Sequence, residues 1–598
     1  MPIYHAPVET ALFVLRDVCH WDRHANRPGF SDAPLDTVEA ILGEAGRFCE
    51  EVLLPLNRVG DTQGCVRAED GSVTTPTGFA DAYRQYREAG WPTLAADPAY
   101  GGQGLPYTLA ALVNEFVTSA NMAWGMYPGL TQGAIAALSR HGSDAQKATY
   151  LTKLVSGEWT GTMNLTEPQC GTDLGLVRTK AVAGNDGSYA ITGQKIFISA
   201  GEHDLAENIV HLVLARIEGA PAGTKGLSLF VVPKRLPDEA GNPGARNALS
   251  CGSLGEKMGI HGNATCVMNY DGASGWLVGE PEKGLRAMFT MMNDARIGVA
   301  LQGLALSEIA CQNAAAYARD RRQGRALSGA SEPDKPADPI IVHPDIRRTL
   351  MTIRAFNEAA RALLLFVAAR GDAGMRSDDA KEREAADDIM GLLTPVLKGV
   401  LTDKGFDNTV AAQQVLGGHG YIAEWGMEQF VRDARIAMIY EGANGIQALD
   451  LVGRKLPKDG GRAAMAFFGE IAAFLKEHAG DEALAPYLKP LERGLGDLQR
   501  ATMWFMQNAM MKPDNAGAGS TDYMHLFGTV AFGYMWALMA KAAAARLAEG
   551  ADGKDGFYET KLRLGRFYME RTMPETALRL ARIEAGADTM MGMPAEAF

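Results

Sequence analysis

Apolar residues recur every three to four positions through most of the first quarter of the chain. The runs LDTVEAILGEAGRFCEEVLLPL at 35–56 and YTLAALVNEFVTSANMAW at 107–124 follow this spacing, which predicts amphipathic helices. Between them, DPAYGGQGLP at 97–106 collects Gly and Pro residues that interrupt helices. The pattern predicts an N-terminal helical domain over residues 1–160.

The pattern changes over residues 161–280. Short apolar runs rich in Val, Ile, Phe and Tyr are bounded there by Gly, Asn and Asp, a texture typical of strands and turns. The runs are SYAITGQKIFISA, NIVHLVLARI, LSLFVVPK and ATCVMNYDG. We expect a central β domain built as a small sandwich or barrel, and therefore a chain of the α+β class.

Helical spacing returns over 281–455 and continues in an additional helical domain over 456–598. A loop rich in Pro and Asp, GRALSGASEPDKPADP at 324–339, interrupts the first of these regions. In the second, PDNAGAGSTD at 513–522 predicts a loop between two helices. The longest apolar stretch, 526–540, falls short of the roughly 20 residues of a membrane span, so we expect a buried helix there.

Charge and cysteine content argue against several classes of protein. The net charge of −13 argues against a nucleic-acid surface, which needs clustered Lys and Arg. The 7 cysteines are scattered and never form CxxC, which predicts neither a disulfide framework nor a zinc site, and no other metal site is expected. The opening MPIYHAPVETALFVL lacks the features of a signal or transit peptide, so a cytoplasmic location is expected.

Three segments carry candidate chemistry. NLTEPQCGTD at 164–173 enters the β region with small hydroxyls and glycine, which could hold the edge of a polar planar ring system, although alone it is also an ordinary turn. GQKIFIS at 193–199 is a strand with one aromatic ring. QVLGGHGY at 414–421 has glycines that could approach a phosphate, yet it follows a helical pattern and so is not a Rossmann fingerprint.

In this order the segments resemble the acyl-CoA dehydrogenase family. NLTEPQCGTD resembles the family's flavin-edge motif, GQKIFIS the strand that follows it, and AYARDRRQG at 316–324 the arginine segment for the cofactor diphosphate. QQVLGGHGY followed by RDARIAMIYEGANGIQ at 432–447 resembles the C-terminal signature. The resemblance covers about residues 30–455 and implies an acyl-CoA dehydrogenase-like fold whose third domain is a four-helix bundle.

The resemblance implies an FAD enzyme that dehydrogenates an acyl-CoA substrate and passes electrons to electron-transfer flavoprotein, as a homodimer or homotetramer. It implies Glu441 as the catalytic base. The implied substrate contacts are Thr172, Arg296, Tyr440 and Gly442. The implied cofactor contacts are Met163, Leu165, Thr166, Gly171, Thr172, Phe197, Ile198, Ser199, Arg321, Gln323, Gln414, Gly417 and Gly418. Arg321 is implied to reach the diphosphate across a subunit interface.

The chain departs from the family pattern at several positions. Thr172 stands where Ser is usual and keeps the hydroxyl, and Phe197 replaces Trp, keeping a ring but losing an indole donor. Gly324 directly follows Gln323, where the family usually has Phe-Gly. Ala443 and Gly445 replace Thr and Gln after the glutamate. Flavin contacts at 324, 443 and 445 are therefore not expected.

Glu441 lies in the apolar run IYEGANGIQ. Removing hydrogen between Cα and Cβ of a thioester needs a base for the α-proton and a cofactor for the hydride. A solvated Glu, with a pKa of about 4.3, is too weak a base, and an apolar setting raises a carboxyl's pKa. Some relatives place the base on an earlier helix, but the matching position here is Ala295, which favours Glu441.

Several functions stay open. The opening YHAPVETALFVLRDV and the helical appendix most resemble the branch that acts on 3-methylmercaptopropionyl-CoA, whose relatives act on medium- or long-chain acyl-CoAs of β-oxidation. An acyl-CoA oxidase would use the same base but pass electrons to oxygen. A flavin-bearing, DNA-associated homologue would need a basic appendix, and a membrane-bound appendix is a variant of the main interpretation. We expect neither a nucleic-acid partner nor a membrane.

Overall fold

The structure is a computed structural model that describes residues 2–509, 511–551 and 553–598, and for residues 293, 294 and 554 the backbone only. It divides into two compact units. Unit 1 comprises Met1–Gly43 and Val299–Phe598, and unit 2 comprises Glu44–Gly298. The limits fall inside helices α2 (Leu35–Phe48) and α7 (Gly284–Asp320).

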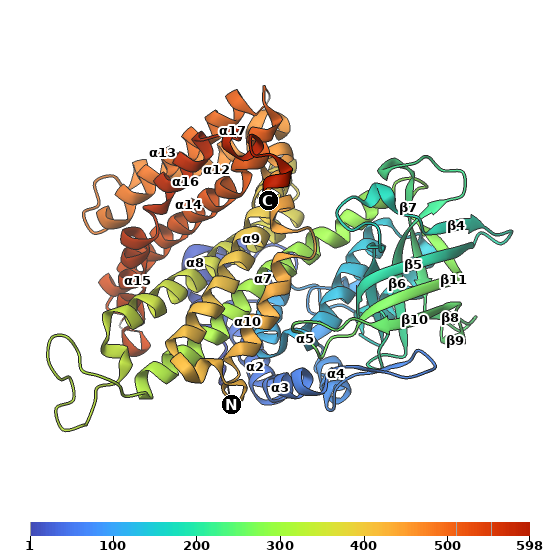
Figure 1. Cartoon of the computed structure of the whole chain (residues 1–598), viewed down its shortest axis with the longest axis horizontal. Coiled ribbons are helices and arrows are strands. Elements are labelled where there is room, and N and C mark those ends of the chain that lie inside the picture. Colours follow the sequence, from blue (N-terminus) through green and yellow to red (C-terminus); the bar gives the residue numbers. More distant parts are fainter. Residues whose placement is uncertain (1, 510, 552) are drawn as a thin grey trace. The chain divides into compact units, whose positions relative to one another are not determined.

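The described part of unit 2 holds a 7-stranded sheet (Figure 1, green). Its strands are β3 (Trp159–Asn164), β4 (Lys180–Ala183), β5 (Tyr189–Ser199), β6 (Asn208–Ile217), β7 (Leu227–Pro233), β10 (Leu249–Leu254) and β11 (Thr265–Val278). Strand pairing runs from β11 through β5, β4, β6 and β7 back to β11, so these strands close a barrel. β3 joins β6 in parallel and β10 joins β11 antiparallel. Two short ladders, β1–β2 (Val66–Arg67, Val73–Thr74) and β8–β9 (Arg235–Pro237, Pro243–Arg246), are separate from this sheet.

Strand β6 shows why this region reads as continuous apolar runs. Val213 and Ala215 belong to the core inside the barrel, whereas Val210, Leu212 and Leu214 belong to a second core outside it. Side chains of a strand alternate between faces, so a strand buried on both faces is apolar at nearly every position. The second core is completed by residues of α5 (Tyr107–His141), α6 (Asp144–Val155) and the start of α7.

Helix α5 places β3, the strand that leads into the NLTEPQCGTD segment. A side chain at Gly161 of β3 would put its Cβ 2.3 Å from Cβ of Ala134, so glycine permits the close approach. The Gly161 amide donates to Thr131 Oγ1 of the same helix at 3.1 Å. Unit 2 also contains the α-helices α3 (Leu54–Gln63) and α4 (Phe79–Glu88).

Unit 1 contains a helical bundle followed by the additional helical domain. The bundle consists of the later part of α7, α8 (Pro344–Met375), α9 (Ala380–Val415), α10 (Met427–Arg435) and α11 (Asn444–Asp450). Helices α7 and α9 cross at backbone contact, because a Cβ at Gly303 would lie 2.3 Å from the Leu401 carbonyl oxygen and one at Gly405 2.3 Å from that of Gly303. The N-terminal α1 (Val8–Phe13) also belongs to this unit.

The additional domain comprises α12 (Arg462–Glu477), α13 (Ala485–Asn508), α14 (Pro513–Ala548), α15 (Phe557–Arg571), α16 (Glu575–Glu584) and α17 (Asp588–Met591) (Figure 1, orange to red). Helix α14 packs against α13, α15 and α16, and also against α8, α9 and α11 of the bundle. Glycines allow this contact: a Cβ at Gly399 would meet Met524 Sδ at 2.3 Å, and one at Gly528 would meet Val400 at 2.9 Å. Helix α14 is long and apolar enough to cross a membrane, but 83% of its apolar window is buried, as predicted for a buried helix.

One prediction about this domain is wrong. Residues 513–522, predicted as a loop, form the first turns of α14. Pro513 is compatible with a helix start, because the first amide of a helix has no intrahelical acceptor. Gly519 is held by packing, since a Cβ there would meet the Phe505 ring at 2.9 Å. Asn515 contributes by accepting a 3.0 Å hydrogen bond from the Ala587 amide.

Candidate active site

A tight turn shapes the NLTEPQCGTD segment of unit 2. Glu167 and Cys170 exchange backbone hydrogen bonds of 2.9 and 3.0 Å, which closes the turn around Pro168 and Gln169. The Ile196 amide donates to the Thr166 carbonyl at 2.9 Å, so the segment lies along β5. Beyond the turn Gly171 and Thr172 are exposed, and Asp173 ends it by accepting from the Gly175 amide at 3.0 Å.

A buried ion pair fixes the same turn. Lys195 Nζ, fully buried, donates to Glu167 Oε1 at 2.9 Å and to the Leu165 carbonyl at 2.9 Å. Glu167 also accepts from the Thr179 hydroxyl at 2.6 Å and from the Arg178 amide at 2.7 Å. Burial alone would raise the pKa of Glu167, but Lys195 and these hydrogen bonds lower it to about 2. The carboxylate is therefore a structural anchor that is charged at neutral pH.

The aromatic residue of the GQKIFIS strand projects from the sheet. Phe197 has φ +59° at an irregularity in the pairing of β5 with β11, and 71% of the side chain is exposed. A non-glycine residue in the left-handed region costs on the order of 1–3 kcal/mol, so the surrounding contacts must hold it. Its neighbours differ: Ile198 points into the barrel core, and the Ser199 carbonyl accepts from the Thr162 hydroxyl at 2.7 Å.

The turn after β3 and the exposed Phe197 of β5 form one candidate surface in unit 2. Met163 and Thr166 are half-buried, Leu165 is buried, and Gly171 and Thr172 are exposed. Because β5 and the turn are joined by the Lys195 and Ile196 contacts, the exposed Phe197 ring and the hydroxyl-bearing turn come from adjacent strand ends. An aromatic face beside hydroxyl and amide donors suits a planar ring system with polar edges.

Arg296 lies elsewhere in unit 2, on α7. It is only 6% exposed, which disfavours a role in a surface salt bridge. At Ala295, the position of the base in some relatives, there is no carboxylate. Contact of Arg296 with a substrate remains a prediction.

A second group of candidates gathers at one corner of unit 1. Tyr317, in the last turns of α7, donates or accepts a 2.9 Å hydrogen bond with His419 Nδ1, and the His419 ring stacks on Trp425 at 4.6 Å. This joins the end of α7 to the glycine-rich turn after α9. The candidates displayed there are all exposed: Arg321, Gln323, Gln414, Gly417 and Gly418.

The corner is suited to an anion. Arg321 follows α7 directly, and its guanidinium forms no hydrogen bond or ion pair with the residues that the structure describes. A Cβ added at Gly417 or Gly418 would meet nothing within 4 Å, so the backbone there is open to an approaching ligand. Gly417 needs its glycine, because φ is +56°.

Glu441 lies on a strained loop between α10 and α11, also in unit 1. Glu441 has φ +57° and Gly442 φ +86°, so two successive residues are left-handed, and both are half-buried. Before them Tyr440 donates its hydroxyl to Gln302 Oε1. Burial, together with the charge of Glu441, raises the pKa of Tyr440, so its phenol stays neutral.

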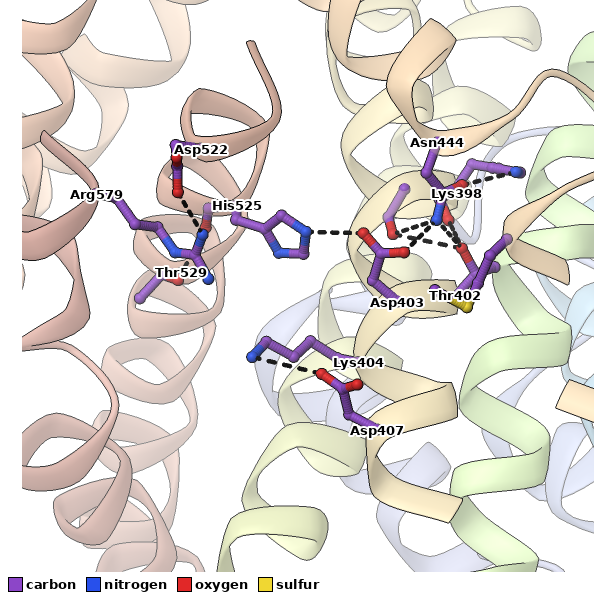
Figure 2. Close-up of polar contacts among 12 residues, drawn as sticks. Lys398, Thr402, Asp403, Lys404, Asp407, Asn444, Asp522, His525, Thr529 and Arg579 are labelled. Atoms are coloured by element: carbon purple, nitrogen blue, oxygen red, sulfur yellow. Dashed lines mark hydrogen bonds and ion pairs between the residues drawn. The ribbon is translucent and has the colours of Figure 1, made fainter. Parts of the chain in front are cut away.

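Contacts from α9 and α11 hold this loop. The Gly442 carbonyl accepts from Lys398 Nζ at 3.0 Å and from Gln447 Nε2 at 3.1 Å. Lys398 Nζ also donates to Asn444 Oδ1 at 2.7 Å. Asn444, the first residue of α11, therefore shares the Lys398 ammonium with the carbonyl of Gly442, the residue after Glu441. Figure 2 shows the contact between Lys398 and Asn444.

Family models match the chain almost end to end. Residues 36–158 match the acyl-CoA dehydrogenase N-terminal domain, 162–273 the middle domain and 282–456 the C-terminal domain. Residues 467–594 match a domain described as acetyl-CoA dehydrogenase C-terminal like. A 3-methylmercaptopropionyl-CoA dehydrogenase of Ruegeria pomeroyi is 44% identical over 98% of this chain and 99% of its own length. The chain belongs to the acyl-CoA dehydrogenase family.

Another relative in the family is a broad-specificity linear acyl-CoA dehydrogenase of Mycobacterium tuberculosis, 35% identical over the full length of both chains. Two solved structures share the fold. Caenorhabditis elegans ACDH-11 in complex with C11-CoA has a TM-score of 0.76 at 20% identity, covering 96% of this chain and 92% of its own. An acyl-CoA dehydrogenase of Bacillus anthracis complexed with FAD has a TM-score of 0.72 at 21% identity, covering 92% and 88%.

The predicted fold class and the predicted enzyme class, acyl-CoA dehydrogenase, are confirmed. FAD is the cofactor of this family, as predicted, and the residues present fit it. The exposed Phe197 ring beside the Thr166 turn suits an isoalloxazine ring, and the open glycines with Arg321 suit a diphosphate. The individual site residues stay predictions.

Sequence reasoning missed the residues that hold these loops. Lys195 and Asn444 lie inside motifs that were recognised, GQKIFIS and EGANGIQ, but neither received a role. A lysine at a strand position within an apolar run was the available signal for a buried ion pair, because lysine is almost never fully buried unpaired. Lys398 and Asp403, on a helix far from the motif, gave no such signal.

Proposed function

We propose that the chain removes hydrogen from Cα and Cβ of an acyl-CoA thioester, with Glu441 as the base for the α-proton. The carboxylate follows the apolar run IAMIY, sits half-buried, and lies on a loop whose unusual backbone is held from two sides. Backbone strain held in place by its surroundings is common where a side chain must be aimed at a reacting atom. This is the observation that carries the proposal.

The other residues of the loop support the same chemistry. Neutral Tyr440 adds no competing negative charge beside the base. Gly442 has no Cβ where an acyl chain and a ring must pass close together. Negative charge develops on the thioester oxygen as the proton leaves, and the backbone amide of Glu441 is the proposed donor to that oxygen. FAD, when bound, supplies the acceptor for the β-hydride at N5.

We infer 3-methylmercaptopropionyl-CoA as the substrate and 3-methylthioacryloyl-CoA as the product, because the 44% identical relative carries that name over nearly equal lengths. A medium- or long-chain linear acyl-CoA is the second candidate, favoured by the Mycobacterium tuberculosis relative. Thr172 and Arg296 are proposed contacts to either substrate, and Arg296 is the candidate for holding its CoA end. Electron-transfer flavoprotein is the proposed acceptor of the electrons, in the cytoplasm.

Substitution of Glu441 by Gln tests the proposal. Glutamine keeps the shape but cannot take a proton, so we expect FAD and acyl-CoA to bind while turnover falls by at least about 10²-fold, the lower end of general-base contributions. Anaerobic titration of wild type with acyl-CoAs of graded length, with and without a thioether, then ranks substrates by flavin bleaching. A variant that keeps more than about a tenth of the wild-type rate places the base elsewhere. Rapid peroxide formation in air would favour an oxidase instead.

A further inference from the structure

A series of polar contacts runs from the loop between α10 and α11 that carries Glu441, here called the catalytic loop, into the additional domain (Figure 2). Asn444 Nδ2 donates to Asp403 Oδ1 at 2.6 Å, and also to Thr402 Oγ1 at 2.9 Å. The other carboxylate oxygen of Asp403, Oδ2, lies 2.8 Å from Nε2 of His525 on α14. All these residues belong to unit 1.

The partners of Asp403 in these contacts are buried, whereas the Asp403 side chain itself is 19% exposed. Lys398 and Thr402 are fully buried, Asn444 is 8% exposed and His525 7% exposed. A hydrogen bond to a charged group in such a setting is roughly twice as strong as one between neutral groups. Because water has little access to the buried partners, each hydrogen bond restrains the position of the two residues that it joins.

The geometry assigns the hydrogen-bond roles at His525. A carboxylate only accepts, so Nε2 of the imidazole carries the proton and donates to Asp403. Nδ1 is buried and has no hydrogen-bond partner among the described residues. The imidazole therefore makes one directed polar contact, and that contact is to the carboxylate that holds Asn444.

Neighbouring charges have partners of their own. Asp522, one turn earlier on α14, pairs with Arg579 at 3.0 Å, and Lys404 lies 4.0 Å from Asp407 on α9. Thr529 donates its hydroxyl to the His525 carbonyl at 2.8 Å, which is a contact within α14. Among the labelled residues of Figure 2, only His525 extends from α14 to the Asp403 carboxylate.

We propose that His525 is a positioning residue for Glu441. It orients Asp403, Asp403 orients Asn444, and Asn444 with Lys398 fixes the Gly442 peptide that sets the direction of the Glu441 side chain. The additional domain would thus complete the active site of its own chain without touching the substrate. The inference rests on the proposed role of Glu441 as the base.

Substitution of His525 tests this in the full-length, FAD-loaded protein. His525→Phe keeps a ring but removes the donor. Because a displacement of about 1 Å at a reacting group can cost 10²-fold, we expect kcat to fall roughly tenfold with KM changed less than about twofold. His525→Gln, whose amide nitrogen can donate to Asp403, should recover most of the loss.

A matched control comes from the same helix. Trp536 Nε1 donates to the Ala355 carbonyl of α8 at 3.1 Å, a buried contact between α14 and the bundle that does not lead to the catalytic loop. Trp536→Phe should lower thermal stability while leaving kcat within about twofold of wild type. Equal effects of His525→Phe and Trp536→Phe on kcat would mean that His525 only helps to hold α14 against the bundle, and would overturn the proposal.

Hydrogen–deuterium exchange gives a readout independent of turnover. We expect faster exchange of the peptide covering residues 439–447 in His525→Phe and not in Trp536→Phe. If His525→Phe fails to load FAD, exchange in Asp403→Asn decides, with His525→Gln as the variant expected to keep its protection. Unchanged protection of 439–447 in Asp403→Asn overturns the proposal.

A double-mutant cycle checks that the contacts act in series. The variant with both His525→Phe and Asp403→Asn should lose no more kcat than the more impaired single variant, since both changes interrupt one path. Additive losses would overturn the series arrangement. Failure of the base assignment is distinguishable, because it shows in Glu441→Gln turnover and leaves the exchange result for 439–447 standing.

Discussion

Two glutamates show how differently one chain uses a carboxylate. Glu167 accepts hydrogen bonds from a lysine, a hydroxyl and backbone amides, so its carboxylate stabilises the Glu167–Cys170 turn. Glu441 follows an apolar run and occupies a left-handed backbone position that other residues must hold. The first arrangement gives a carboxylate that is held in the charged form by its partners. The second gives a carboxylate whose direction is set by the backbone conformation. The fold places both roles within a single polypeptide.

The Glu167–Lys195 pair predicts a dependence of stability on pH. The folded pKa of Glu167, about 2, lies below the unfolded value of about 4.3, so its contribution is present above that value and is lost as pH falls toward 2. Lys195→Met leaves a buried carboxylate without its ammonium, and we expect the free energy of unfolding to fall by about 3–5 kcal/mol at pH 7. FAD content should fall with it, because the Thr166 turn is loosened.

Urea unfolding at pH 7 and pH 3.5 measures this effect. The difference between wild type and Lys195→Met should shrink at the lower pH, since Glu167 in the variant is then protonated. Arg84→Met, which removes an exposed pair with Asp81, is the control and should leave stability unchanged at both values. A difference that is the same at both pH values would contradict the assignment.

The motif residues could be predicted from sequence because their spacing is local. Thr166, Phe197 and Glu441 each lie in a short segment whose residue types point to one chemistry. The residues that hold these segments could not be predicted in the same way. Asp403 lies 41 positions before Asn444 and 122 before His525, and no periodic pattern links such distant positions.

At the scale of helices and strands, periodicity predicted most of what forms. The apolar runs became β5, β6, β7 and β11, and 107–124 became the first half of α5. Alternation within a run could not show which strands pair, so the closure of the barrel through β7 and β11 became visible only in three dimensions.

The loop predicted for residues 513–522 is wrong for a physical reason. Gly, Asn and Ser in an isolated peptide favour turns, and this local preference predicted a loop. In the folded protein the same small residues let α14 approach α13, and the contact with Phe505 stabilises the helix against that preference. Glycines at 303, 399, 405 and 528 act similarly where helices cross, and their role depends on partners that the local sequence does not contain.

At the scale of the whole molecule, the candidate site residues of unit 1 lie at two places, the Glu441 loop and the corner that carries the cofactor candidates. Lys398, beside the catalytic loop, and Gln414, beside the glycine-rich turn, are both on α9, and roughly 24 Å of helix separates them. Large apolar side chains near the turn are exposed: Tyr421, Ile422 and Trp425. A homodimer or homotetramer in which Arg321 serves the FAD of another chain stays a prediction.

We therefore expect sedimentation at assay concentration to show at least a dimer. Arg321→Ala should leave the oligomer intact but weaken FAD binding about ten- to hundredfold, as expected for the loss of hydrogen bonds from a charged donor. Arg563→Ala, which removes an exposed residue of α15, should change neither property. A fully active monomer would falsify the cross-subunit role of Arg321.

The additional domain joins the rest of unit 1 through buried contacts. Lys561 Nζ, fully buried, donates to Glu358 of α8 at 2.6 Å and to Thr10 of α1 at 3.1 Å. Trp536 is fully buried, and its indole binds the α8 backbone. Removing the domain would expose the facing surfaces of α8 and α9, at about 1.5–3 kcal/mol for each large apolar side chain left in water.

Ending the chain after Lys455 is the decisive test of what this domain does. We expect the truncated protein to be insoluble or poor in FAD, because its bundle loses its apolar cover and the catalytic loop loses the His525 contact. The intact protein should not float with liposomes, since 83% of the apolar window of α14 is already buried in protein. A truncated protein that is soluble, fully flavinated and equally active, beside an intact protein that floats, would identify the domain as a membrane anchor. The cover that α14 gives to α8 and α9 is the physical reason to expect the opposite.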